Sequence, residues 1–428
     1  MKFYSTKDRS VSVSLKEAVI NNLPAGGGLY LPEEIPRIQP GQLESLASLS
    51  FPEHSFEILH TLLTNSLPRK ILEAICYKAF SFDVPLVRLA TNLYTLELFH
   101  GPSLAFKDFG VRFMAELLTY YHDGRDLTVL TATSGDTGGA VAAAFYARKG
   151  FDVFILYPSG KVSALQELQI ASLGGNVRAI EVDGTFDDCQ RLVKSALVDQ
   201  KILARRTFCS ANSINVARLL PQICYYFWAV TKLPAKTSPI FSVPSGNFGN
   251  VTACLLAKQM GLPVKTVVAA TNVNDIVPRY LRSGNYEVQQ FKSTLANAMD
   301  IADPSNFIRI QALYQDSLEK LQSELQAFAF SDEETKAAIA FLYRQYRYSS
   351  EPHAAIGYLG LKLLLQQDPN SIGVFLGTAH PLKFKDIVEP ILATQLAEPA
   401  EVSKFKDAKK RSIKISAQPA DLATILTA

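Results

Sequence analysis

The feature that most constrains the fold is a regular alternation of apolar strands and helical segments that begins near residue 126. Residues 126–133 are typical of a buried strand, and a glycine-rich turn at 134–139 leads into an alanine-rich helix. The alternation continues through strands expected at 152–157, 177–182, 239–243, 264–270 and 371–376, and helices expected at 163–173, 186–199 and 249–260. Strands that are separated by such helices are joined by right-handed crossovers into a parallel sheet. The sequence therefore predicts an α/β fold with doubly wound, mostly parallel sheets.

Length and composition are those of an ordinary globular protein of two or three domains. The chain has 428 residues, of which 48% are hydrophobic and 19% are charged. Its 43 basic and 40 acidic side chains nearly balance, and aromatic residues are not interleaved with basic clusters. Nucleic-acid binding is therefore not predicted, because it requires a basic patch or stripe.

The same composition bears on compartment and metal binding. No apolar run approaches the roughly 18 residues of a membrane span, and residues 1–10 lack the apolar core of a signal peptide. The five cysteines are scattered without a CxxC pair, and the six histidines are far apart. These patterns predict a cytoplasmic protein with reduced thiols, without membrane association and without a metal site.

Three regions are expected along the chain. Residues 1–95 form a mixed, loop-rich N-terminal module, in which proline and glycine turns precede helix-like runs at 55–63 and 69–80. This module contains no catalytic constellation, so a packing or capping role is predicted. Residues 96–400 form the catalytic region. The tail, 401–428, is predicted to be a solvated face because it carries Lys404, Lys406, Lys409, Lys410 and Arg411.

One lysine, Lys107, stands in an unusual setting. It follows a Gly101-Pro102 turn and lies among apolar and aromatic residues, just before a helix-like run at 111–118. Burying an ammonium group without a partner is costly. Two interpretations are open: the side chain extends its charged end into water, or a lowered pKa turns the amine into a nucleophile or Schiff-base former.

A first loop of small and polar residues follows the strand at 126–133, at the sheet edge where open α/β sheets bind ligands. Its backbone N–H groups and hydroxyls are suited to a carboxylate or a phosphate, and the loop consists of Ser134, Gly135, Asp136 and Thr137 followed by two glycines. The alternative is a tight turn in which Asp136 or Thr137 only caps the next helix.

A second loop, between the strand at 239–243 and the following helix, is a candidate anion cradle formed by Gly246, Asn247, Phe248, Gly249 and Asn250. It lacks the Gly-Lys-Ser/Thr of a Walker loop and the GxGxxG pattern of a dinucleotide site. The phosphate that it would bind is therefore expected on a small cofactor rather than on ATP or NAD.

A third loop, after the last strand, offers the hydroxyl of Thr378 to a ring nitrogen or a substrate group, whereas His380 in the same loop is more typical of a structural residue. A Schiff-base lysine, a phosphate cradle and this hydroxyl together meet the requirements of pyridoxal phosphate. The three signals lie on one doubly wound sheet region, and together they are much stronger than any one alone.

Several blocks of the chain resemble the threonine synthases, a group within the tryptophan-synthase-β-like (fold type II) pyridoxal-phosphate enzymes. In family order these blocks are 98–109 (LFHGPSLAFKDF), 131–138 (TATSGDTG), 210–215 (SANSIN), 243–249 (VPSGNFG), 270–275 (ATNVND), 350–353 (SEPH) and 377–381 (GTAHP). The resemblance implies two α/β subdomains of the fold-type-II architecture. It also implies conversion of O-phospho-L-homoserine and water to L-threonine and phosphate, by γ-elimination of phosphate and then addition of water at Cβ.

The resemblance further implies roles for single residues. Lys107 would hold pyridoxal 5'-phosphate as a Schiff base, the loop from Gly246 to Asn250 would cradle the cofactor phosphate, and Thr378 would face the ring nitrogen. The loop from Ser134 to Thr137 would receive the α-carboxylate of the substrate. Asp136 stands where many relatives carry Asn, so its contact with the cofactor stays open.

Two expectations concern the chemistry. Once released from the cofactor, Lys107 would act as a general base beside the substrate carbons, and a hydroxyl partner such as Thr378 would keep the ring nitrogen neutral. The leaving phosphate needs a cation, and Lys161 is the first candidate because it follows a predicted strand end. Arg112 and Lys383 are weaker candidates, and an ordinary surface role for Lys161 is the alternative.

Other functions are kept as alternatives. Another fold-type-II lyase, such as a dehydratase or a phospho-amino-acid phospho-lyase, would share Lys107 and the cradle. A catalytically inactive relative would bind the cofactor without turnover, and a nucleotide-dependent enzyme is disfavoured by the missing phosphate-binding motifs. The sequence leaves the oligomeric state, monomer or dimer, undetermined.

Overall fold

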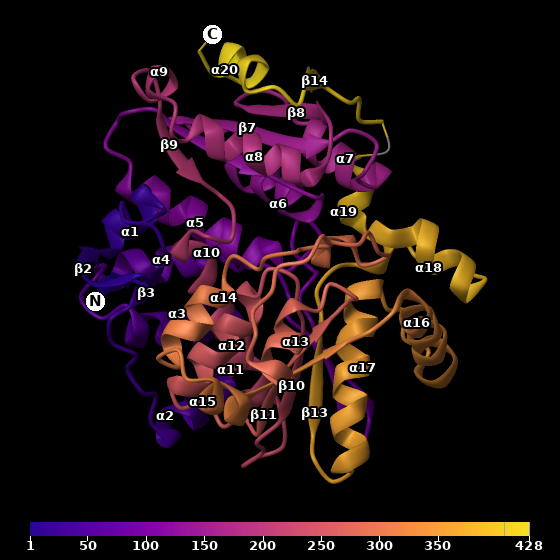
Figure 1. Cartoon of the computed structure of the whole chain (residues 1–428). Coiled ribbons are helices and arrows are strands. Elements are labelled where there is room, and N and C mark those ends of the chain that lie inside the picture. Colours follow the sequence, from indigo (N-terminus) through magenta and orange to yellow (C-terminus); the bar gives the residue numbers. More distant parts are fainter. Residues whose placement is uncertain (406, 428) are drawn as a thin grey trace.

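The computed structural model describes residues 1–405 and 407–427. Its smaller five-stranded sheet, in the upper part of Figure 1, has the order β14-β8-β7-β6-β9, and each of its strand pairs is parallel. Its strands are β6 (Leu127–Ala132), β7 (Phe151–Pro158), β8 (Val177–Asp183), β9 (Thr207–Ser210) and β14 (Ser412–Ser416). The connecting helices are α6 (Asp136–Phe145), α7 (Ala164–Ala171) and α8 (Phe186–Ala196). Helices between parallel strands are the crossovers that the sequence predicts.

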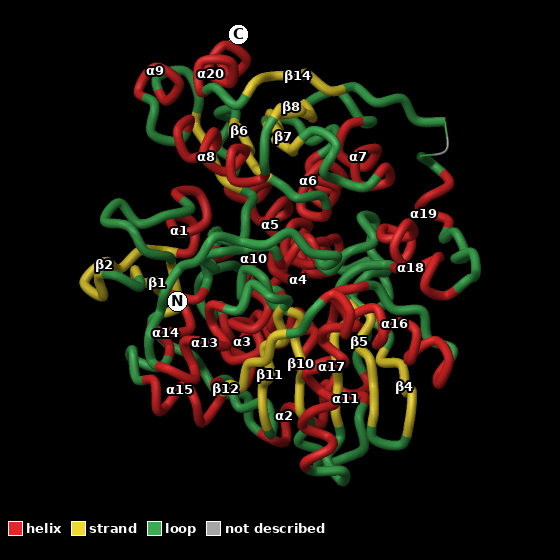
Figure 2. Tube along the Cα trace, turned by 45° about the vertical axis from the view of Figure 1, so that its right-hand side comes forward, coloured by secondary structure: helices red, strands yellow, loops and turns green. Residues whose placement is uncertain are grey.

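A larger six-stranded sheet lies below, in the order β12-β11-β10-β13-β5-β4, and Figure 2 shows several of its strands side by side. Its strands are parallel except for the β4–β5 pair. They are β4 (Leu86–Ala90), β5 (Leu93–Glu97), β10 (Ile240–Pro244), β11 (Thr266–Thr271), β12 (Leu325–Ala329) and β13 (Gly373–Gly377). The predicted α/β class with mostly parallel sheets in two subdomains is confirmed.

Long helices pack around both sheets. Helix α17 (Pro352–Gln367) lies against β10, β11 and β13, and α5 (Lys107–Tyr121) lies against α6. The other helices of this region are α9 (Gln200–Leu203), α10 (Val216–Leu219), α11 (Gln222–Lys232), α12 (Gly249–Gln259), α13 (Ile276–Ser283), α14 (Phe307–Leu313), α15 (Leu318–Glu324), α16 (Asp332–Tyr346), α18 (Lys385–Leu392), α19 (Ala400–Ser403) and α20 (Pro419–Thr427). Among the described residues, none of these helices has both the length and the apolar character needed to cross a membrane.

The N-terminal region has a small antiparallel sheet of its own, in the order β2-β1-β3. Its elements are β1 (Lys2–Ser5), β2 (Asp8–Ser14), α1 (Leu15–Asn21), β3 (Tyr30–Pro32), α2 (Pro40–Ser45), α3 (Phe51–Leu62) and α4 (Arg69–Ala79). Helix α1 begins at a capping box in which Ser14 and Glu17 exchange hydrogen bonds. Helices α3 and α4 confirm the two predicted helix-like runs, whereas β1, β2 and α1 lie in the part expected to be loop-rich.

Two expected boundaries do not coincide with the elements. A division after residue 95 cuts β5, which pairs with β4 and β13 inside the larger sheet. The tail is more than a solvated face, because β14 adds a parallel strand to β8. Lys410 in the tail also lies 2.6 Å from Oε2 of Glu181 and 2.7 Å from Oε1 of Glu167. Lys406 lies outside the described residues.

Candidate active site

Lys107 is the first residue of α5, and the loop before it is tightly braced. Ser103 N donates to Oδ2 of Asp108 at 2.8 Å, and Phe106 N donates to the carbonyl of Thr378 at 2.9 Å. At Gly101 a Cβ atom would come within 2.4 Å of Asp108 Oδ2, so a larger residue would not fit there. The loop therefore holds Lys107 next to the end of β13.

The Lys107 amine has no ordinary partner. Its Nζ lies 3.8 Å from the ring centroid of Phe106, and no described residue accepts a hydrogen bond from it. The surrounding protein lowers the pKa of Lys107 to about 7, mainly through burial, while the nearby Asp136 carboxylate acts in the opposite direction. An amine with a pKa near 7 is partly neutral at neutral pH, and at the base of a pocket it fits the nucleophile interpretation better than the solvated one.

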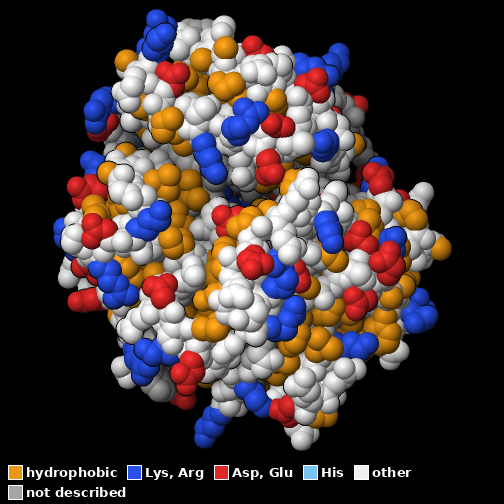
Figure 3. Space-filling model, viewed as in Figure 1, with side chains coloured by type: hydrophobic (Ala, Val, Ile, Leu, Met, Phe, Trp, Pro, Cys, Tyr) orange, Lys and Arg blue, Asp and Glu red, His pale blue; other side chains and the backbone are white. Residues whose placement is uncertain are grey.

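A cavity of about 270 Å³ opens in front of Lys107, at the carboxyl ends of β6, β10 and β13. The three predicted loops meet here, and the residues that line the cavity include Ser134, Asp136, Thr137, Gly246, Asn247, Phe248, Gly249, Asn250 and Thr378. Figure 3 shows a hollow on this side of the molecule, between its upper and lower parts. Gly135 and Lys161 do not line the cavity.

The second loop has the geometry of an anion cradle. Phe248 adopts a left-handed conformation with φ of 58° and leads directly into α12, whose first N–H groups have no partner within the helix. At Gly246 a Cβ atom would come within 2.7 Å of Met299 Cα. Asn250 accepts a hydrogen bond from Tyr226 at 2.6 Å, yet its own Nδ2 donor is buried and has no partner among the described residues. Free donors in a glycine turn fit the phosphate of pyridoxal phosphate.

The first loop is shaped by Thr133, whose Oγ1 accepts hydrogen bonds from Gly135 N and Gly138 N, both at 2.9 Å. Asp136 accepts from Lys383 Nζ at 2.8 Å and from Gln166 Nε2 at 2.9 Å. Burial raises the pKa of Asp136, but the ion pair with Lys383, the Gln166 hydrogen bond and the nearby Lys107 together outweigh burial and hold the pKa below its ordinary value. Asp136 is therefore a carboxylate, which accepts hydrogen bonds but cannot donate one.

Two residues that sequence reasoning did not select also line the cavity. Arg218 is 3% exposed, donates through Nη1 to the carbonyl of Ala211, and leaves its Nε without a partner among the described residues. Burial lowers its pKa to about 10, so the guanidinium stays charged at neutral pH. Ser213 Oγ accepts from Asn247 Nδ2 at 2.7 Å and from Asn306 Nδ2 at 3.1 Å. Both lone pairs of Ser213 are thus used, and its hydroxyl proton is available to a ligand.

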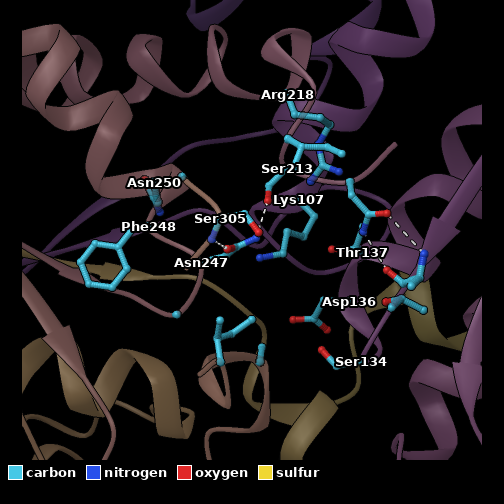
Figure 4. A pocket seen from close by; sticks show the side chains of 18 of the residues that line it. Lys107, Ser134, Asp136, Thr137, Ser213, Arg218, Asn247, Phe248, Asn250 and Ser305 are labelled. Carbon is cyan, nitrogen blue, oxygen red and sulfur yellow. Dashed lines mark hydrogen bonds between the residues drawn. The ribbon is translucent and has the colours of Figure 1, made fainter. Parts of the chain in front are cut away.

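These two residues lie across Lys107 from the first loop. In Figure 4 the side chain of Lys107 lies between Arg218 and Ser213 on one side and Asp136 and Ser134 on the other. The cavity therefore offers separate donors on two sides of the amine. The block 210–215 contains Ser213 and was a sequence signal for it, whereas Arg218 lies outside the block.

The cations expected to bind the leaving phosphate lie elsewhere. Lys161 is exposed in the loop after β7. Arg112 donates through Nε to the carbonyl of Ala79, the last residue of α4, at 2.7 Å. Lys383 is buried and is engaged by Asp136 and by the carbonyl of Ser103. Arg218 replaces them as the candidate cation inside the cavity.

Thr378 belongs to a buried polar cluster with Glu351 and His353. Thr378 Oγ1 donates to Oε1 of Glu351 at 3.3 Å, and Oε2 of Glu351 lies 2.5 Å from Nδ1 of His353. Because a carboxylate only accepts, the hydroxyl proton of Thr378 points toward Glu351. His380 accepts from Leu382 N at 3.2 Å and braces its own loop, as a structural histidine does.

Comparisons with known proteins agree with this geometry. Residues 83–414 match the family model of pyridoxal-phosphate dependent enzymes, and residues 2–80 match the model of the threonine synthase N terminus. Threonine synthase of Escherichia coli strain K12 is 45% identical over 427 residues, which span 99% of this chain and 98% of that protein.

Solved structures give the same result. The crystal structure of threonine synthase from Escherichia coli has a TM-score of 0.94 at 44% identity and covers 100% of this chain and 99% of that chain. The pyridoxal-phosphate-bound threonine synthase from Brucella melitensis has a TM-score of 0.92 at 34% identity, with 100% and 98% covered. The chain therefore belongs to the threonine synthase family of pyridoxal-phosphate-dependent enzymes.

Proposed function

We propose that this protein converts O-phospho-L-homoserine and water to L-threonine and phosphate. The observation that carries the proposal is the position of the Lys107 amine between two separate groups of anion donors, in addition to the glycine cradle. A cofactor phosphate, a substrate carboxylate and a substrate phosphate each need a site. Three such sites around one amine are what this substrate requires.

The cofactor would be held by residues at three points. Lys107 would carry it covalently, the N–H groups of the loop from Gly246 to Gly249 with Asn250 would bind its phosphate, and Thr378 would face its ring nitrogen. When bound, pyridoxal phosphate supplies an electron sink that stabilises negative charge on substrate carbons. Because Thr378 donates its proton to Glu351, it would offer a lone pair that favours a protonated ring nitrogen. A hydroxyl partner alone predicts a neutral ring nitrogen, whereas the hydrogen bond from Thr378 to Glu351 favours the protonated form.

The substrate would span the cavity. The hydroxyls of Ser134 and Thr137 and the start of α6 would bind its α-carboxylate, and Arg218 with Ser213 would bind its phosphate. Lys107 would remove protons from Cα and Cβ, since a base held next to both carbons gains from proximity. Arg218 is positioned to stabilise the leaving phosphate dianion by charge-assisted hydrogen bonds.

Location and domain organisation follow as further parts of the proposal. The five cysteines are free and buried, which supports the reducing environment of a cytoplasm. We place the end of the N-terminal module between residues 80 and 83, where the two family matches meet. We keep residues 401–428 as a C-terminal segment, whose strand β14 pairs with β8 of the smaller sheet. The catalytic region would then include β4 and β5.

The test is a product assay on the cofactor-loaded enzyme. Incubation with O-phospho-L-homoserine should release threonine and phosphate in equal amounts, and Lys107→Ala should lose both turnover and the visible absorbance of the bound cofactor. Phosphate accompanied by 2-oxobutyrate and ammonia would assign the protein to the lyase alternative. Cofactor absorbance without turnover of this substrate would identify an inactive relative.

A further inference from the structure

We propose that Asn22 of the N-terminal module is a positioning residue for the loop that would bind the substrate phosphate, so that this module forms part of the active site. The inference deepens the proposed function and rests on it. It replaces the packing or capping role that the sequence suggested for the module.

The side chain of Asn22 docks directly on the loop after β9. Its Oδ1 accepts from Ser210 N and from Asn215 Nδ2, each at 2.8 Å, and the same Asn215 Nδ2 lies 2.9 Å from the carbonyl of Val19 in the last turn of α1. Asn22 is 6% exposed and has a φ of 63°, a conformation that Asn tolerates better than most residues. The C-terminal end of α1 is thus joined to the loop by three buried hydrogen bonds.

The hydrogen-bonded residues set the position of the anion donors. Asn215 is the N-cap of α10, where its Oδ1 accepts from Ala217 N at 3.0 Å, and Arg218 lies in that short helix. Arg218 in turn donates to the carbonyl of Ala211. Asn22 therefore holds both ends of the segment 210–215, which presents Ser213 to the cavity and caps the short helix that carries Arg218.

A second connection from the N-terminal module supports the same loop. Arg309 has no exposed surface, and its guanidinium donates through Nε to the carbonyl of Tyr30 in β3 at 3.0 Å. It also donates to the carbonyls of Ser213 at 3.1 Å and Ile214 at 2.7 Å. Two separate parts of the module, α1 and β3, are thus connected to the residues that flank Ser213.

The connection is selective. The side chain of Asn22 makes no hydrogen bond with Lys107 or with the cradle from Gly246 to Asn250; among the described residues it bonds to Ile20, Cys209, Ser210 and Asn215. The loop that Asn22 holds contacts the cradle through Ser213 Oγ, which accepts from Asn247 Nδ2 at 2.7 Å. Loss of the Asn22 side chain should therefore weaken the phosphate site more than it weakens cofactor binding. A residue that only stabilised the fold would weaken both together.

The test measures the affinity of the cofactor-loaded enzyme for inorganic phosphate by calorimetry. Asn22→Gly removes the side chain and tolerates the positive φ, and it should raise the phosphate Kd about tenfold, because one buried N–H loses its acceptor and the loop is released. The cofactor affinity should fall much less than the phosphate affinity, because the cradle shares only the Ser213–Asn247 hydrogen bond with this loop. Asn65→Gly is the matched control, since Asn65 is an exposed residue of the same module with a φ of 64°, and it should leave the phosphate Kd unchanged.

Asn215→Ser breaks the same connection from the loop side and retains a good N-cap. The double variant should bind phosphate no more weakly than the weaker single variant, because both changes remove one interaction. An unchanged phosphate Kd in Asn22→Gly, or equal losses of phosphate and cofactor affinity, would overturn the inference. The product assay on the wild-type enzyme keeps the two failures apart: absence of threonine overturns the proposed function, whereas threonine formation together with an unchanged phosphate Kd in Asn22→Gly overturns the inference alone.

Discussion

Lys383 Nζ lies 2.8 Å from Oδ1 of Asp136, and the two side chains are 0% and 7% exposed. This enclosed ion pair adjoins Lys107, whose pKa the carboxylate raises and the ammonium of Lys383 lowers. Removing one partner of the pair should therefore shift the pKa of Lys107 in a direction set by the charge that remains.

Asp136→Asn should move the pH profile of cofactor attachment to lower pH, and Lys383→Met should move it to higher pH. The measurement is the rate at which visible absorbance appears when pyridoxal phosphate is added to cofactor-free protein at each pH, since only the neutral amine reacts. The pH profile of the double variant should lie between the profiles of the two single variants. Because breaking a buried pair costs about 3–5 kcal/mol, thermal unfolding must first establish that each variant is folded. Shifts of the same sign in both single variants would contradict the prediction.

Arg218→Met should raise the KM for O-phospho-L-homoserine by about 10- to 100-fold, the effect of losing charge-assisted hydrogen bonds. The cofactor should still attach, because the cradle lies on another loop, but the pH profile of its attachment should move to higher pH, since Arg218 lowers the pKa of Lys107. Lys161→Met is the comparison variant, and its KM should stay within about twofold of wild type because Lys161 is exposed outside the cavity. A larger increase in KM for Lys161→Met than for Arg218→Met would instead identify Lys161 as the phosphate ligand.

The sequence predicted the long apolar strands better than the short ones. β6, β7, β8, β10 and β13 carry runs of buried residues, which are the usual mark of a central parallel strand. β14 has the sequence Ser-Ile-Lys-Ile-Ser with one buried residue, and β9 has only four residues. Such edge strands owe their existence to pairing with a neighbour, which local composition does not reveal.

The same limit applies to the cavity. Its glycine loops could be found because loops with unusual composition after strands are visible in a sequence. Arg218 could not be found in this way, because it lies in the otherwise apolar run from Val216 to Leu220. Its role depends on the burial of its Nε without a partner, which arises only when the chain folds. Asn22 likewise lies 188 residues from Ser210 in sequence. Long-range hydrogen bonds of this kind have no local signature.

Acid should destabilise the protein through His54. This side chain is fully buried between Phe51 and Trp228, both ring nitrogens lack partners among the described residues, and burial lowers its pKa to about 3. Below about pH 6.5 the unfolded chain binds a proton that the folded protein excludes, so the free energy of unfolding should fall by up to about 1.4 kcal/mol per pH unit.

His54→Leu should flatten this dependence between pH 6 and pH 4, as measured by urea unfolding. His60→Leu, the same change at the half-buried end of α3, provides the control and should leave the slope near that of wild type. Equal slopes in wild type and His54→Leu would exclude His54 as the source of acid sensitivity.

Lys107 should extend the rise of stability with pH into the alkaline range in cofactor-free protein. Its pKa is about 7 in the fold and about 10.4 in the unfolded chain. Between these values the unfolded chain binds one more proton, so Lys107 contributes a free energy of unfolding that rises with pH and is smallest below pH 7. Lys107→Met lacks this titration, and the difference between the two proteins should therefore change steadily from pH 7 to pH 10. Attachment of the cofactor removes the free amine, so loaded wild-type enzyme should lose this component of the slope. A constant difference between wild type and Lys107→Met across the range would mean that the amine keeps its ordinary pKa, and the neutral nucleophile at neutral pH would have to be abandoned.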